Sequence, residues 1–133
     1  MKNKAAFALA IACAVSIVAA GCARTGPIQN VNDAAVTTPS AKALTASQVR
    51  SAVITAGTSL GWRMVDAGPG KLEGTLNLRT HTAVVDIPYS AKTYSIVYKS
   101  SENLYEANGQ IHTNYNGWVQ NLDRAIRTEL SRN

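Results

Sequence analysis

Residues 71–88 read KLEGTLNLRTHTAVVDIP, and this stretch decides the fold. In its first half, apolar residues or glycine alternate with polar residues, which is the pattern of a strand with one buried face. The alternation changes parity after Arg79 and resumes at Ala83, so we expect a turn or bulge between two strands. Pro88 ends the second strand because proline has no amide proton to donate to a neighbouring strand.

Further strands are expected on both sides of this hairpin. Residues 62–67 lead into a Gly-Pro-Gly turn, and residues 93–99 alternate between apolar and polar side chains. An Asn-Gly pair typical of hairpin turns separates residues 103–107 from 110–112, and a brief pairing of these two segments is expected.

Helices are expected before and after the strands. Thr45 and Gln48 have the spacing of a capping box, apolar residues then recur at helical spacing, and Gly61 stands where a left-handed C-cap is expected. A stronger amphipathic pattern follows near the C-terminus, where Thr113 or Asn114 is expected to cap the helix.

These elements predict one α+β domain over residues 44–133. Its expected architecture is a two-layer sandwich, in which about four antiparallel strands form one layer and both helices pack on the same sheet face. The other sheet face, which carries the polar residues of each strand, is expected to meet water.

Residues 1–21 predict a bacterial lipoprotein signal peptide. Lys2 and Lys4 precede an apolar run over 5–20, which is short for a permanent membrane span, and small residues stand before Cys22. The end of this segment resembles a lipobox, which implies cleavage before Cys22 and acylation of its thiol. A plain secretory leader or an uncleaved anchor remains the alternative.

Several consequences follow for the mature chain. Cys13 lies in the leader and Cys22 takes lipid, so no disulfide is expected. Residues 22–43 are rich in small and polar residues and predict a flexible tether with a span of about 25 Å. Enteric lipoproteins that stay in the inner membrane carry Asp after the cysteine, so Ala23 implies the periplasmic face of the outer membrane.

Composition and charge exclude two classes of protein. With 46% hydrophobic and 16% charged residues, the chain is too apolar for a disordered protein. Removal of residues 1–21 leaves 112 residues and a formal charge of +3, without a concentrated basic cluster. Nucleic acid is therefore not an expected partner.

The domain also resembles a known group of proteins. Residues 80–89 (THTAVVDIPY), 94–98 (YSIVY) and 111–122 (IHTNYNGWVQNL) resemble a family of small proteobacterial lipoproteins. The resemblance covers most of residues 44–130 together with the lipobox. It implies a cell-envelope location and the expected fold, and it supplies no catalytic residues, because no activity is known for the family.

An enzymatic function is the less favoured interpretation. His81 and His112 are the only histidines, and with Asp86 they are the candidates for a metal site or for acid–base catalysis in a small periplasmic hydrolase. No HExxH, GxSxG, SxxK or phosphate-binding glycine motif is present, and no cofactor is expected. The simpler interpretation places His81 in a turn and pairs His112 with backbone groups near the last helix.

A binding surface is the favoured interpretation. Tyr89 and Tyr105, with Lys92 and Asn103 nearby in the sequence, offer flat rings and polar groups suited to sugars or to a protein interface. We therefore expect a lipid-anchored envelope protein whose domain is not an enzyme. Its expected partners are the membrane, through acyl chains, and peptidoglycan or another envelope protein.

Overall fold

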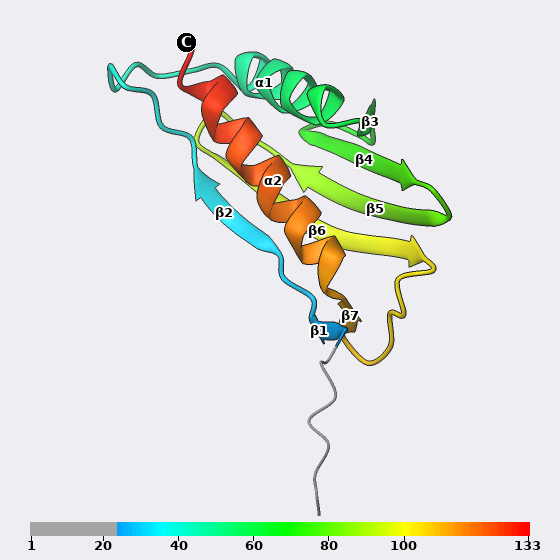
Figure 1. The fold of residues 1–133 in the computed structure, drawn as a ribbon. Coiled ribbons are helices and arrows are strands. Elements are labelled where there is room, and N and C mark those ends of the chain that lie inside the picture. The colour runs from blue at the N-terminus through cyan, green and yellow to red at the C-terminus, as the bar shows by residue number, and fades with distance from the viewer. Residues whose placement is uncertain (1–23) are drawn as a thin grey trace, which may run out of the picture.

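A five-stranded antiparallel sheet forms the centre of the fold in a computed structural model that describes residues 24–133 (Figure 1). The strands lie in the order β2-β6-β5-β4-β3. Their bounds are β2 Val31–Ala35, β3 Arg63–Asp66, β4 Lys71–Leu78, β5 His81–Pro88 and β6 Thr93–Glu102. The predicted signal peptide and Cys22 lie outside the described residues.

The predicted central hairpin is confirmed. β4 and β5 pair from Lys71 with Pro88 to Leu78 with His81, and Arg79 turns the chain with a φ of 56°. Buried residues alternate along both strands and share one face, as expected for a period of two: Leu72, Gly74, Leu76, Ala83, Val85 and Ile87. The predicted α+β class is also confirmed, with one more strand in this sheet than expected.

Two helices cover the buried face of the sheet and pack against each other (Figure 1). They are α1 (Ala46–Ser59) and α2 (Thr113–Leu130). The capping box of Thr45 and Gln48 is present, and Gly61 follows α1 with a φ of 88°. The prediction for the α2 cap was wrong, because His112 caps this helix through its Nδ1 atom, which accepts from the Asn114 amide at 3.1 Å.

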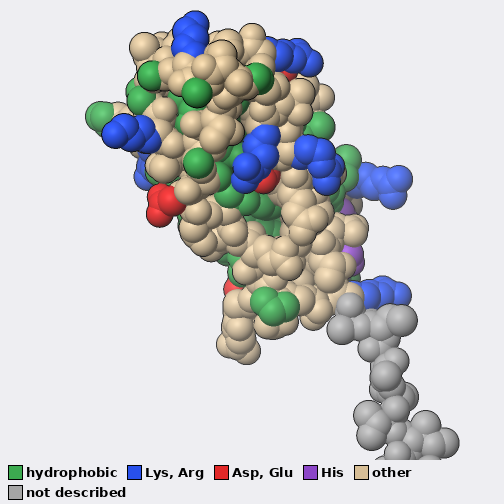
Figure 2. Space-filling view, turned by 90° about the vertical axis from the view of Figure 1, so that its left-hand side faces the viewer, with side chains coloured by type: hydrophobic (Ala, Val, Ile, Leu, Met, Phe, Trp, Pro, Cys, Tyr) green, Lys and Arg blue, Asp and Glu red, His purple; other side chains and the backbone are tan. Residues whose placement is uncertain are grey.

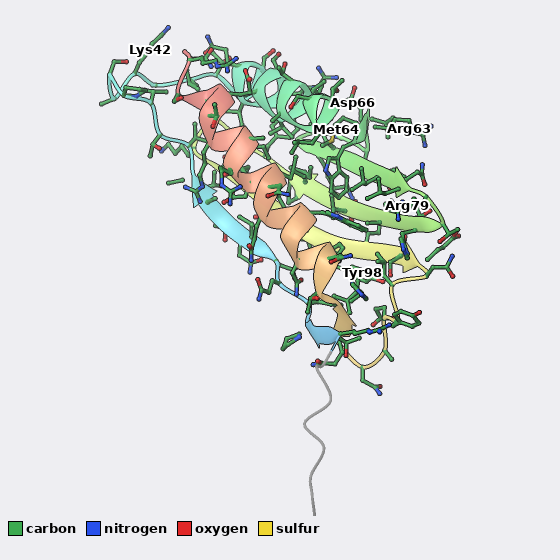
Figure 3. The ribbon with its side chains drawn as sticks, in the orientation of Figure 1. Lys42, Arg63, Met64, Asp66, Arg79 and Tyr98 are labelled. Atoms are coloured by element: carbon green, nitrogen blue, oxygen red, sulfur yellow. The ribbon has the colours of Figure 1, made fainter. Side chains whose placement is uncertain are left out.

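A close approach between α1 and the sheet depends on two glycines. A Cβ at Gly57 of α1 would lie 2.0 Å from Met64 Cε, and one at Gly74 of β4 would lie 3.1 Å from Met64 Sδ. Met64 of β3 therefore occupies space that only these glycines leave open. Figure 3 shows this methionine directed toward α1.

The predicted tether over 22–43 is wrong for much of its length. Thr25–Pro27 forms strand β1, which pairs with β7 (Gln110–His112), and β2 pairs with the edge of β6. Ala34 of β2 belongs to the core. Sequence periodicity missed these strands because β1 has three residues and the β2 register shifts between Val31 and Ala34.

Asn116, a buried residue of α2, fastens the connection between β1 and β2. Its side-chain amide donates to the Pro27 carbonyl at 2.9 Å, and its Oδ1 accepts from the Gln29 amide at 3.0 Å. The segment therefore satisfies its polar groups against the domain, as buried backbone must.

The predicted brief pairing of 103–107 with 110–112 consists of a bridge between Ala107 and Gln110 and a bond from the His112 amide to the Leu104 carbonyl at 2.7 Å. The strand partner of β7 is β1. The Ile28 amide extends this ladder by donating to the Gly109 carbonyl at 2.9 Å. The intervening loop turns through four left-handed residues, which are Asn103, Tyr105, Asn108 and Gly109.

Candidate functional site

The four residues expected to form a binding surface lie at opposite ends of β6. Lys92 comes immediately before this strand and Asn103 immediately after it. The ten strand residues between them span about 33 Å at the usual rise of a strand. Tyr89 pairs with Tyr94 near the Lys92 end, whereas Tyr105 follows Asn103. The structure therefore does not bring the four residues together, because β6 separates Tyr89 and Lys92 from Asn103 and Tyr105.

Three of these residues differ in their contacts and in their exposure to solvent. Tyr89 is half-buried against the core, and its amide donates to the Gly70 carbonyl at 2.9 Å. The Asn103 side chain donates to the Thr80 carbonyl at 2.7 Å, which ties the loop to the β4–β5 turn. Only Tyr105, with 70% of its surface exposed, presents its ring freely.

The two histidines bond to the backbone. His81 Nδ1 lies 2.8 Å from the Asn103 carbonyl oxygen, so it carries the proton and donates, since a carbonyl only accepts. His112 Nδ1 accepts from the Asn114 amide, so its proton lies on Nε2. His112 therefore bonds to the backbone near the last helix, as the simpler interpretation expects. His81 is the first residue of β5, and its ring centroid lies 6.4 Å from that of Trp118.

Asp86 does not join the histidines. His81 and Asp86 differ by an odd number of positions on β5, so their side chains point to opposite sheet faces. Asp86 lies on the outer face of the sheet. Lys99 Nζ lies 3.8 Å from Asp86 Oδ1 there, and 2.6 Å from Glu73 Oε2. Within residues 24–133, no three His, Cys, Asp or Glu side chains are grouped so that they could hold a metal ion.

A groove runs between α1 and α2. Three adjoining cavities of about 320, 650 and 70 Å³ follow the two helices. The first two share Thr55 of α1 and Glu129 of α2, and the last two share Leu60 and Asn121. The shared lining residues show that the cavities adjoin one another, and we call them together the interhelical groove.

The interhelical groove has more positive than negative charge. Arg124 of α2 and Arg132, which follows that helix, line its largest cavity, and Glu129 is the acidic residue there. Arg132 lies 3.1 Å from Glu129, whereas the polar contact of Arg124 is with Asn121 Oδ1 at 3.2 Å. Arg124 therefore keeps an uncompensated charge at the groove, where a carboxylate could pair with it.

Sequence reasoning missed this groove. Arg124 and Thr128 are four residues apart on α2 and share one helix face, which was a detectable signal, and Arg132 follows two residues after the helix ends. The opposite wall, however, comes from α1, and only the tertiary packing of the two helices creates the groove. Thr55, Ser59 and Leu60 supply that wall.

A partly buried hydrogen bond joins α2 to the sheet. The Tyr94 hydroxyl of β6 donates to Asp123 Oδ1 at 2.5 Å, and Arg127 Nε donates to Asp123 Oδ2 at 3.0 Å. Burial and this hydrogen bond raise the pKa of Tyr94 above its usual range. Tyr94 therefore acts as a neutral donor that joins the sheet to the helix layer.

On the face drawn in Figure 2, the basic side chains lie apart from one another. Figure 2 shows Lys and Arg side chains at several separate positions on one face, with hydrophobic side chains between them. Figure 3 places Lys42 near one end of the molecule and Arg79 at the β4–β5 turn.

Among residues 24–133, no helix has the length and apolar character needed to cross a bilayer. Comparison of the chain with protein-family models, with curated proteins and with solved structures gave no match.

Proposed function

We propose that this chain is a lipid-anchored protein of the cell envelope whose domain binds a carboxylate-bearing peptide in the interhelical groove. Acyl chains on Cys22 hold it at a membrane, and the absence of Asp at position 23 favours the periplasmic face of the outer membrane. The proposal places the helices and the main sheet in a two-layer sandwich, with the polar sheet face toward water. The domain acts by binding and not by catalysis.

The observation that carries this proposal is the charge of the groove. Arg124 faces a groove whose largest cavity measures about 650 Å³, which is within the range of small-ligand sites. Hydroxyl and amide groups of Thr55, Thr128 and Asn121 stand beside it and can accept or donate hydrogen bonds. Guanidinium groups pair with carboxylates in a bidentate geometry, so an acidic peptide matches this lining.

The envelope offers two sources of such a peptide. Stem peptides of peptidoglycan carry several carboxylates, and acidic segments of other envelope proteins carry the same groups. Both sources share the chemistry that the groove would recognise. The alternative hydrolase, built on His81 and His112, has less support because Asp86 lies on the other face of β5.

An NMR titration of residues 23–133 tests the proposal. We expect soluble stem peptides to shift amide resonances along α1 and α2 in a saturable way, and the sugar backbone without peptide to leave them unchanged. A synthetic acidic peptide from no cell-wall source provides the second arm, because equal binding would favour a protein partner. No groove shifts with either peptide would overturn the proposed function.

Matched variants test the role of charge. Arg124→Ala should weaken binding by about tenfold or more, since a hydrogen bond to a charged group contributes about 1.5–3 kcal/mol. Arg63→Ala is the control, because Arg63 is an exposed cation of β3 outside the groove lining. Equal affinities of the two variants would contradict recognition by Arg124.

A further inference from the structure

The geometry points to a membrane-contacting end of the domain, formed by β1, β7 and the loop 103–109, with Tyr105 in the headgroup region of the bilayer. This inference rests on the proposed acylation of Cys22. It replaces the predicted flexible tether, with its span of about 25 Å, with a domain that sits directly on the lipid surface.

The first argument is the length of chain between Cys22 and the folded domain. Thr25 already pairs with His112, and the Thr113 amide donates to the Arg24 carbonyl at 2.9 Å. Three residues of chain span at most about 11 Å, whatever their conformation. The polar headgroup layer of a bilayer leaflet is about 5–8 Å thick. An acylated Cys22 would therefore hold β1 at the headgroups.

The second argument is the position of Tyr105 at this same end. Its ring lies 6.3 Å from the ring of His112, the residue that pairs with Thr25. Figure 1 shows the β6–β7 loop beside β1, where the described chain begins. The exposed ring and the anchored end of the chain therefore face the same side of the molecule.

The third argument is that the backbone conformation around Tyr105 holds its ring outward. Leu104, one residue earlier, is buried in the core, and its carbonyl accepts from the His112 amide at 2.7 Å. Tyr105 itself has a φ of 55°, a left-handed conformation that is unfavourable for a bulky residue. Such local strain persists only where the surroundings hold it and often marks a functional contact. Tyrosine, with an apolar ring and a polar hydroxyl, is enriched at membrane interfaces.

Charge is not the main attraction at this surface. Arg24 stands two residues after Cys22, and Glu106 follows Tyr105 in the loop, so this end of the domain carries both a basic and an acidic residue. Contact should therefore depend on the short connection and on the tyrosine ring, and should persist at high salt.

Site-specific fluorescence of the lipidated protein in vesicles tests the inference. The vesicles contain phosphatidylethanolamine and phosphatidylglycerol, with or without a lipid that carries a nitroxide quencher in its headgroup. Glu106→Cys provides a labelling position that keeps Tyr105, and Ser47→Cys at the start of α1 is the control at the other end. We expect an environment-sensitive dye to shift to the blue and to be quenched at position 106 only.

Two further variants separate the contributions. A flexible Gly/Ser insertion of about 20 residues between Ala23 and Arg24, with a reach of about 25 Å, should reduce the quenching at position 106. Tyr105→Ser should reduce it as well, with the anchor unchanged.

The outcomes distinguish the two proposals. Protein that floats with the vesicles but shows equal signals at positions 47 and 106 would overturn the membrane-contacting end and leave the lipid anchor intact. Protein that fails to float, and whose mass shows no acyl chains on Cys22, would overturn the anchor and this inference together.

Discussion

The backbone amide of Thr113, the first residue of α2, donates to the carbonyl oxygen of Arg24 at 2.9 Å. This bond joins the beginning of the described chain to the beginning of the last helix. With the β1–β7 ladder, it makes residues 24–36 a structural part of the domain. The proposed anchor at Cys22 would therefore also fix which end of the domain faces the membrane.

Tyr94→Phe tests the link between the sheet and α2. The hydroxyl donates to a carboxylate in a partly buried position, and hydrogen bonds to charged groups contribute about 1.5–3 kcal/mol. We expect the free energy of unfolding, measured with urea, to fall by about that amount. Tyr105→Phe is the matched control, since its exposed hydroxyl has little effect, and equal losses in the two variants would contradict the account.

Two glycine substitutions in helices should have opposite effects. Gly57→Ala places a Cβ against Met64, so we expect a loss of about 1–3 kcal/mol from overpacking. Gly117→Ala in α2 meets open space and should stabilise by up to about 1 kcal/mol, because alanine favours helix. Thermal unfolding measures both. A gain in stability from Gly57→Ala would show that Met64 does not occupy the position described.

Alkaline pH should unfold the domain through its buried tyrosines. Burial, followed by the contact with Asp123, raises the pKa of Tyr94, and burial raises that of Tyr115, whose ring edge meets Tyr98. Both hold their protons more tightly in the folded state than in the unfolded state. The stability that they contribute is fully present below about pH 10, the unfolded pKa, and is lost as the pH rises above it.

Tyrosinate absorbance and near-ultraviolet circular dichroism check this prediction together. Part of the tyrosine ionisation should coincide with the loss of tertiary structure, and Tyr94→Phe should diminish that part. Ionisation of all five tyrosines in a domain that stays folded would refute it.

The elements with a strong period could be predicted from the sequence. The β4–β5 hairpin and both helices have patterns that repeat over eight residues or more, and their local signals agree with the tertiary packing. β1 and β2 could not be predicted because they are short, and a bulge with Asp33 in a left-handed conformation interrupts β2. Their partners, β7 and β6, lie far along the chain.

The candidate site was less predictable than the fold. Tyr89 and Tyr105 are close in sequence, yet β6 runs between them and carries them apart. The interhelical groove depends on the packing of α1 against α2, which no local pattern specifies. Asn116, which resembles an ordinary helix-start residue, instead fastens the β1–β2 connection from 87 positions away.

Amide hydrogen exchange on residues 23–133 tests the central claim most directly, which is that the chain after Cys22 is folded into the domain. The Ile28 and Val36 amides donate to Gly109 and Lys92 at 2.9 and 2.8 Å, so they should exchange slowly. The exposed Ser40, in the β2–α1 connection, is the fast-exchanging reference. Exchange of Ile28 and Val36 as fast as that of Ser40 would show a flexible tether and contradict the account.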